Sequence, residues 1–94
     1  MTFGAYILIQ TGVGRASDVA AQMRRLPGVS SVDAVAGPYD VIARAEADTI
    51  DALGRFVVSQ MQPIDGVTRT LTSPIVALSS RTPRRSIDNS PARA

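Results

Sequence analysis

Hydrophobic residues are grouped along the chain into six blocks, and Gly or Pro separates most of them. The first block, residues 5–10, is rich in β-branched residues and lies between Gly4 and Gly12, a pattern that predicts a strand. Both of its faces are apolar, with Ala5, Ile7 and Ile9 on one and Tyr6 and Leu8 on the other. A strand with one solvated face alternates more cleanly, so we expect both faces of this sheet to be covered.

Two blocks repeat apolar residues every three or four positions, as an amphipathic helix does. The first stripe ends before Pro27-Gly28 and consists of Ala16, Val19, Ala20, Met23 and Leu26. The second ends before Pro63, follows Asp48 and Thr49 as candidate caps, and consists of Ile50, Leu53, Val57 and Met61. We expect both stripes to face the core.

The other three blocks read as strands over residues 29–36, 39–46 and 67–78. The short turn at Gly37-Pro38 predicts an antiparallel hairpin. The last strand carries Thr68, Thr70 and Thr72, which we interpret as a solvated or subunit-facing row. The order β-α-β-β-α-β predicts an α+β, ferredoxin-like fold, with an antiparallel sheet and both helices on one face. The bare face then favours a sheet-to-sheet dimer with a second copy.

Charge divides the chain into two parts. Residues 1–79 carry a net charge of −1 and form the predicted domain, whereas residues 80–94 carry +3 and read as a disordered basic tail. The tail lacks interleaved aromatic residues, so we expect no direct specific DNA binding. No basic segment precedes the first apolar block, and that block is too short to span a membrane. We therefore expect a cytoplasmic protein without membrane contact.

The composition limits the available chemistry. The chain has no Cys and no His, which removes disulfides, thiolate metal sites, the commonest general base and the commonest metal ligand. The sequence Gly12-Val13-Gly14 before a helix is a weak anion-binding signal and is more typical of a turn. We therefore expect no enzyme activity, no catalytic residues, no metal and no cofactor.

Asp40 is the main candidate for ligand recognition, because it follows Gly37-Pro38-Tyr39 at the start of a predicted strand. Its carboxylate is suited to a ligand ammonium, and glycine lets a ligand approach the backbone amides closely. The alternative is a contact that only stabilises the turn. The hydroxyl of Thr72 is a weaker candidate for a ligand hydrogen bond.

Three motifs together resemble the effector domain of the Lrp/AsnC (leucine-responsive, feast/famine) regulators, also called the RAM domain. They are Leu26-Pro27-Gly28-Val29, residues 35–41 with Gly-Pro-Tyr-Asp, and Pro63-Ile64-Asp65-Gly66-Val67, and the resemblance covers residues 3–78. It implies sheet-to-sheet dimers, often closed into octamers, with amino-acid effectors bound where dimers meet. Carried over by position, Gly37 and Tyr39 would shape the pocket, Asp40 would meet the amino group, and Thr72 would contribute less.

The sequence departs from this family at its start. Typical members carry an N-terminal helix-turn-helix, whereas the first strand here begins at residue 5. We therefore expect a stand-alone effector module that acts by co-assembly with a full-length regulator. Two alternatives stay open. One is a small dimeric α/β-barrel enzyme, which the absence of His and Trp disfavours, and the other is a structural oligomerisation unit without a ligand.

Overall fold

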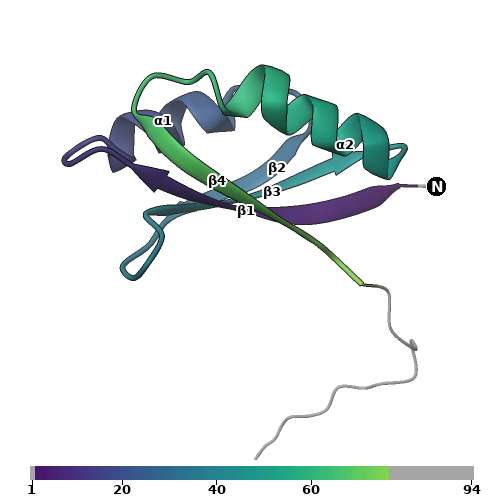
Figure 1. The fold of residues 1–94 in the computed structure, drawn as a ribbon, viewed down its shortest axis with the longest axis horizontal. Helices are drawn as coiled ribbons and strands as arrows, with labels where there is room; N and C mark the ends of the chain where they lie inside the picture. Colours follow the sequence, from purple (N-terminus) through teal and green to yellow (C-terminus); the bar gives the residue numbers. More distant parts are fainter. Residues whose placement is uncertain (1, 77–94) are drawn as a thin grey trace, which may run out of the picture.

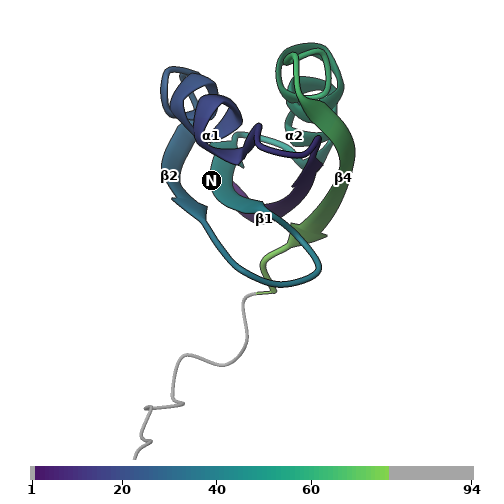
Figure 2. The same ribbon diagram turned by 90° about the vertical axis from the view of Figure 1, so that its left-hand side faces the viewer.

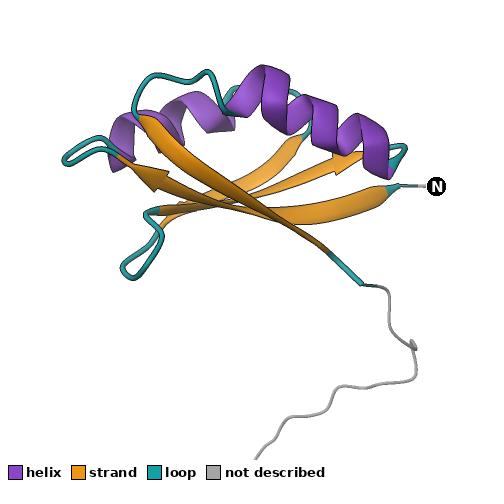
Figure 3. Ribbon diagram, viewed as in Figure 1, coloured by secondary structure: helices purple, strands orange, loops and turns teal. Residues whose placement is uncertain are grey.

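The computed structural model describes residues 2–76, which form four strands and two helices (Figures 1 and 3). In chain order the elements are β1 (Phe3–Thr11), α1 (Ala16–Arg24), β2 (Val29–Ala34), β3 (Val41–Ala47), α2 (Ile50–Phe56), its π-helical continuation η1 (Val57–Met61) and β4 (Val67–Pro74). This order confirms the predicted succession of elements. The last strand ends at Pro74, earlier than the predicted end at Leu78, because Ile75 and Val76 lie outside it. The predicted tail, residues 80–94, lies outside the described residues.

The four strands form one antiparallel sheet in the order β2-β3-β1-β4. Both helices cover the same face of this curved sheet, and the opposite face is open (Figure 2). The predicted ferredoxin-like α+β fold is therefore confirmed. Among the described residues, no helix is long and apolar enough to cross a membrane.

The core lies between the helices and the covered face of the sheet. Every second residue in the middle of β1 faces it, and Ala5, Ile7 and Ile9 are fully buried. The other buried residues come from the paired strands and from the predicted helical stripes: Val19, Ala20, Met23, Val32, Val41, Ala43, Ala45, Leu53, Val57 and Met61. Burying an aliphatic side chain of this kind contributes about 1.5–3 kcal/mol. The core thus follows the apolar periodicity of the sequence.

The second helix differs from the prediction at its first residue. Thr49 caps it by accepting a hydrogen bond from the amide of Ala52 at 2.9 Å, but Ile50 is 49% exposed. The buried stripe is Leu53, Val57 and Met61, with a spacing of four. Such a spacing drifts around an α-helix of 3.6 residues per turn, and the wider turn of η1 offsets the drift. Ile50 belongs to the outer face of the helix, so its assignment to the core was wrong.

The open face of the sheet is partly apolar. Tyr6 and Leu71 are each 44% exposed on it, and Leu8 lies between them, opposite Leu71 and Ile42. The prediction that β1 has two apolar faces is confirmed. The threonines of β4 are different, because Thr70 and Thr72 pair with Ile9 and Ile7, and directly paired residues share a face.

This register determines which face of the sheet carries Thr70 and Thr72. Thr70 and Thr72 lie on the helix side of the sheet and are half-buried. Thr70 accepts a hydrogen bond from the side-chain amide of Gln62 at 3.0 Å. Thr70 and Thr72 therefore do not lie on the open sheet face, and a contact of this row with another subunit stays a prediction.

Candidate functional site in the loop between β2 and β3

The candidate site is built on the loop of residues 35–40, which projects on the side of the sheet away from the helices (Figure 1). The strand β2 ends at Ala34 rather than at residue 36, and β3 begins at Val41 rather than at residue 39, so the connection has six residues rather than a tight Gly-Pro turn. Pro38 has no amide hydrogen and Gly37 has a φ of 150°, and neither continues a regular ladder. The local sequence therefore opens the hairpin at this point.

Main-chain and side-chain hydrogen bonds hold the loop against the end of β1. The amide of Asp40 donates to the carbonyl of Ile9 at 2.9 Å, and the amide of Val35 donates to the carbonyl of Asp40 at 2.9 Å. The side-chain amide of Gln10 donates to the carbonyl of Pro38 at 3.0 Å. The position of the loop is thus fixed by a strand distant in sequence.

The Asp40 side chain takes part in the same attachment. Its Oδ2 accepts a hydrogen bond from the amide of Thr11 at 2.8 Å, and the contact is partly buried. The pairing of β1 with β3 ends at Ile9 and Val41, so β3 offers no main-chain partner to the amide of Thr11 two residues further along β1. Within residues 2–76, the structure shows no hydrogen bond to the second oxygen, Oδ1. The carboxylate therefore stabilises the loop with one oxygen and keeps the other for a further contact.

Gly37 is an exposed and uncrowded position of the loop. A Cβ added to it would have no heavy atom of the described chain within 4 Å, and its positive φ favours glycine. Tyr39 and Asp40, which follow, are half-buried. The structure thus brings Gly37, Tyr39 and Asp40 together in one accessible segment.

Thr72 lies elsewhere in the subunit. It is on β4, opposite Ile7, whereas Asp40 precedes β3, and β1 lies between these two strands. Two strand spacings separate them by about 10 Å, and Thr72 points to the helix side. A single subunit therefore does not bring Thr72 to the loop.

Sequence reasoning missed Gln10 and Thr11 as members of this site. Their contacts to the loop span 28 and 29 residues, a separation at which a local motif gives no information. The one available signal was that Gln10 is polar at the end of an otherwise apolar strand.

Comparison with known proteins identifies the family of this domain. The family model described as the Lrp/AsnC ligand binding domain matches residues 4–86. The chain belongs to this family. An uncharacterised HTH-type transcriptional regulator of Pyrococcus horikoshii is 38% identical to it over 55 residues, which are 58% of this chain and 37% of that regulator. The chain thus matches little more than a third of the length of that curated relative.

Solved structures agree with this assignment. The Thermus thermophilus protein TTHA0845 has a TM-score of 0.76 at 27% identity, over 82% of this chain and 96% of that one. A transcriptional regulator from Neisseria meningitidis, solved as a complex with L-Met, has a TM-score of 0.71 at 25% identity, over 80% of this chain and 50% of that one. The Lrp/AsnC domain described here therefore has relatives of its own size and relatives about twice as long.

The open sheet face of this Lrp/AsnC domain carries one charged group with incomplete pairing. The Arg44 guanidinium lies 5.9 Å from the ring centre of Tyr6, and its Nε is 3.4 Å from a carboxylate oxygen of Glu46. That Nε is buried, yet it makes no hydrogen bond of acceptable geometry within the described residues. The Glu46 carboxylate therefore matches the charge of Arg44 within the subunit without a well-aligned hydrogen bond to this nitrogen.

Proposed function

We propose that this Lrp/AsnC domain is a non-enzymatic sensor that binds an amino-acid-like effector at the loop of residues 35–40. In this account it influences transcription by assembling with a full-length regulator and does not itself read DNA sequence. The observation that carries the proposal is the Asp40 carboxylate, which is held in place by the Thr11 amide and retains one oxygen for a ligand. The HTH-type regulator among the relatives supports the link to transcription.

The chemistry of the loop suits an α-amino acid. The free oxygen of Asp40 would receive the ammonium group, and backbone amides near Gly37, which no side chain crowds, would hold the carboxylate. Tyr39 would form a wall for the ligand side chain. The Neisseria regulator solved with L-Met supports this ligand class. The identity of the effector is to be determined by a binding screen.

The proposal includes assembly through the open sheet face. Tyr6, Leu8 and Leu71 form an apolar surface there, and a second sheet packed at about 10 Å would bury it. We propose a dimer of this kind as the basic unit, with dimers associating further, up to an octamer, so that Thr72 of one subunit contributes to the loop of another.

A second candidate function is a structural oligomerisation unit without an effector. The contact between Asp40 and Thr11 favours it, because that contact gives the acid a purely structural task. In that case the Gly-Pro-Tyr-Asp loop has only a structural role at the edge of the assembly and binds no ligand. The two candidates differ in whether any small molecule binds.

A thermal-shift screen of the whole chain against the twenty amino acids separates them. A ligand at a hundred times its Kd stabilises the folded state by about 2.7 kcal/mol by mass action. The sensor proposal expects a saturable increase of the melting temperature with one chemical class of amino acid. If none of the twenty raises it at millimolar concentration, the structural unit is the better account.

A further inference from the structure

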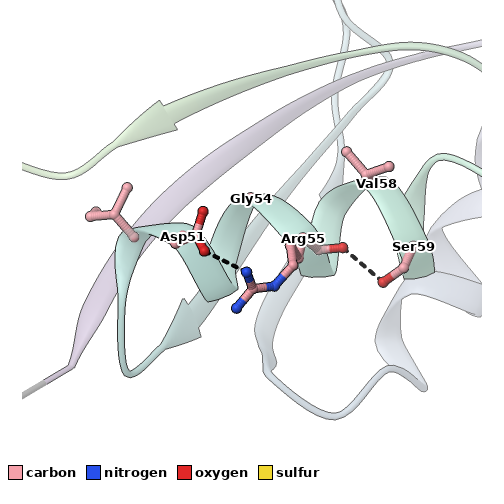
Figure 4. A pocket seen from close by; sticks show the side chains of 6 residues that line it. Asp51, Gly54, Arg55, Val58 and Ser59 are labelled. Atoms are coloured by element: carbon pink, nitrogen blue, oxygen red, sulfur yellow. Dashed lines mark hydrogen bonds and ion pairs between the residues drawn. The ribbon is translucent and has the colours of Figure 1, made fainter.

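The outer face of α2 carries a groove that the proposed function does not use. It has a volume of about 810 Å³ and lies on the solvent side of the helix (Figure 4). Its lining residues are Ile50, Asp51, Gly54, Arg55, Val58 and Ser59. Within the described chain the groove is open, and its apolar members Ile50 and Val58 are 49% and 61% exposed.

The apolar row of the groove follows the helix at intervals of four. Ile50, Gly54 and Val58 therefore lie one above the other, with a notch at Gly54 between two aliphatic side chains. Gly is the least favourable helix residue after Pro. A Cβ added to Gly54 would meet no atom of the described chain within 4 Å, so packing inside the subunit does not require glycine. The notch is suited to the close approach of another backbone.

A charged row runs beside the apolar one. Asp51 and Arg55 form an exposed ion pair one helical turn apart, and the hydroxyl of Ser59 donates to the carbonyl of Arg55 at 2.7 Å (Figure 4). Asp51 precedes the notch and Arg55 follows it. This order makes the face self-complementary, because reversing the direction of the helix exchanges the two signs.

We propose that a second copy of this chain docks on the groove, helix against helix and antiparallel, with Gly54 at the crossing. At a rise of 1.5 Å per residue, Ile50 lies about 6 Å before the crossing, at the level of Val58 in the other copy. Along the helix axis, Asp51 lies about 4.5 Å from the crossing, and Arg55 of the other copy lies about 1.5 Å from it on the same side. The two residues are therefore about 3 Å apart along the axis. Ridges at intervals of four pack into one another in this way in many helix pairs.

This contact is separate from the sheet-to-sheet contact, because α2 covers the opposite face of the sheet (Figure 2). A subunit with two different two-fold contacts joins dimers into closed rings or filaments. The helix contact requires no effector, so it stands or falls independently of amino-acid binding.

The first test uses cysteine cross-linking, which is unambiguous here because the chain has no Cys. Gly54→Cys places the sulfurs of two copies at the crossing. We expect oxidation of micromolar protein to convert most of it to a covalent dimer. Ala21→Cys, at an exposed position of α1, is the matched control and is expected to stay uncross-linked. Equal cross-linking of the two variants would overturn the proposal.

The second test exchanges charges between chains. Asp51→Arg and Arg55→Asp each destroy the ion pair within the chain, and each is expected to reduce the sedimentation mass of the assembly. Mixing the two variants is expected to restore the wild-type mass, which only a contact between chains can do. Gly54→Gln fills the notch in open space, so it is expected to lower the mass. At low concentration, where helix docking is weakest, it is expected to raise the melting temperature because glutamine favours the helix more than glycine does.

A wild-type mass that all three substitutions leave unchanged would contradict the proposal, whether that mass is a monomer, a dimer or a larger assembly. The thermal-shift screen against amino acids is run on the same variants. A shift retained by Gly54→Gln, together with a reduced mass, shows that sensing and helix docking are separate. An unchanged mass with a normal shift overturns the helix contact and leaves the proposed function intact.

Discussion

The carboxylate of Asp40 accepts a hydrogen bond from the backbone amide of Thr11, 29 residues earlier in the chain, at 2.8 Å. This bond ties the loop of residues 35–40 to the end of the central strand β1, at an irregularity of its pairing with β4. A ligand that engages the free oxygen of Asp40 would thus act on a group already attached to the core of the sheet.

Substitutions at Asp40 separate its structural task from its charge. Asp40→Ala leaves the partly buried amide of Thr11 without its acceptor and is expected to lower the free energy of unfolding by about 1 kcal/mol. Asp40→Asn keeps an oxygen acceptor and is expected to unfold like the wild type. Urea denaturation of the three proteins measures the difference. Equal stability of Asp40→Ala and wild type would show that the contact contributes nothing.

The open sheet face is expected to control assembly. Leu8→Glu places a charge at the centre of the apolar surface between Tyr6 and Leu71, and burying an unpaired charge is costly. Sedimentation equilibrium is expected to give a lower mass for this variant than for the wild type, which is expected to be at least a dimer. Ala21→Glu, on the helix side, serves as the control. An unchanged mass for Leu8→Glu would exclude this face as the interface.

The buried residues of β1 are expected to dominate stability. Ile7 is fully buried between β3 and β4, and Ile7→Ala is expected to cost about 2–5 kcal/mol, the usual range for large-to-small core substitutions. Val13→Ala, at a fully exposed loop position, is expected to leave the unfolding midpoint unchanged. Comparable losses at the two positions would contradict the assigned core.

Two glycines are expected to respond oppositely to alanine. Gly66 has a φ of 102°, and a Cβ there would lie 2.9 Å from a methyl carbon of Val19. Gly66→Ala is therefore expected to destabilise the fold by more than about 1 kcal/mol. Gly54→Ala adds a methyl group in open space within a helix and is expected to stabilise the subunit by up to about 1 kcal/mol. Thermal unfolding at low concentration, where helix docking is weakest, compares them; destabilisation by Gly54→Ala would contradict the account.

The order of elements was predictable because each one carries its own periodicity. The alternation in β1 and the stripe through Val19 and Met23 are local patterns, and burial follows them. Ile50 was misplaced because spacing alone does not fix the helix phase when the next residues form a π-helical turn. The faces of Thr70 and Thr72 depend on the register with β1, which local sequence does not encode.

The candidate site was predictable only in part, for the same physical reason. Gly37, Tyr39 and Asp40 are neighbours in sequence and stay neighbours in the loop. The Thr11 amide and the Gln10 side chain reach that loop through strand pairing, a contact between distant segments. Thr72 is separated from the loop by β1, and a single subunit does not reunite them.

The central claim is that Asp40 recognises the ammonium group of an amino-acid-like effector. Its most direct test is calorimetric titration of wild type and Asp40→Asn with the amino acid that raises the melting temperature most. A charge-assisted hydrogen bond contributes about 1.5–3 kcal/mol, so Asp40→Asn is expected to bind about ten- to a hundredfold more weakly at unchanged stability. If Asp40→Asn binds with the wild-type Kd, Asp40 is not the ammonium partner and the claim is wrong.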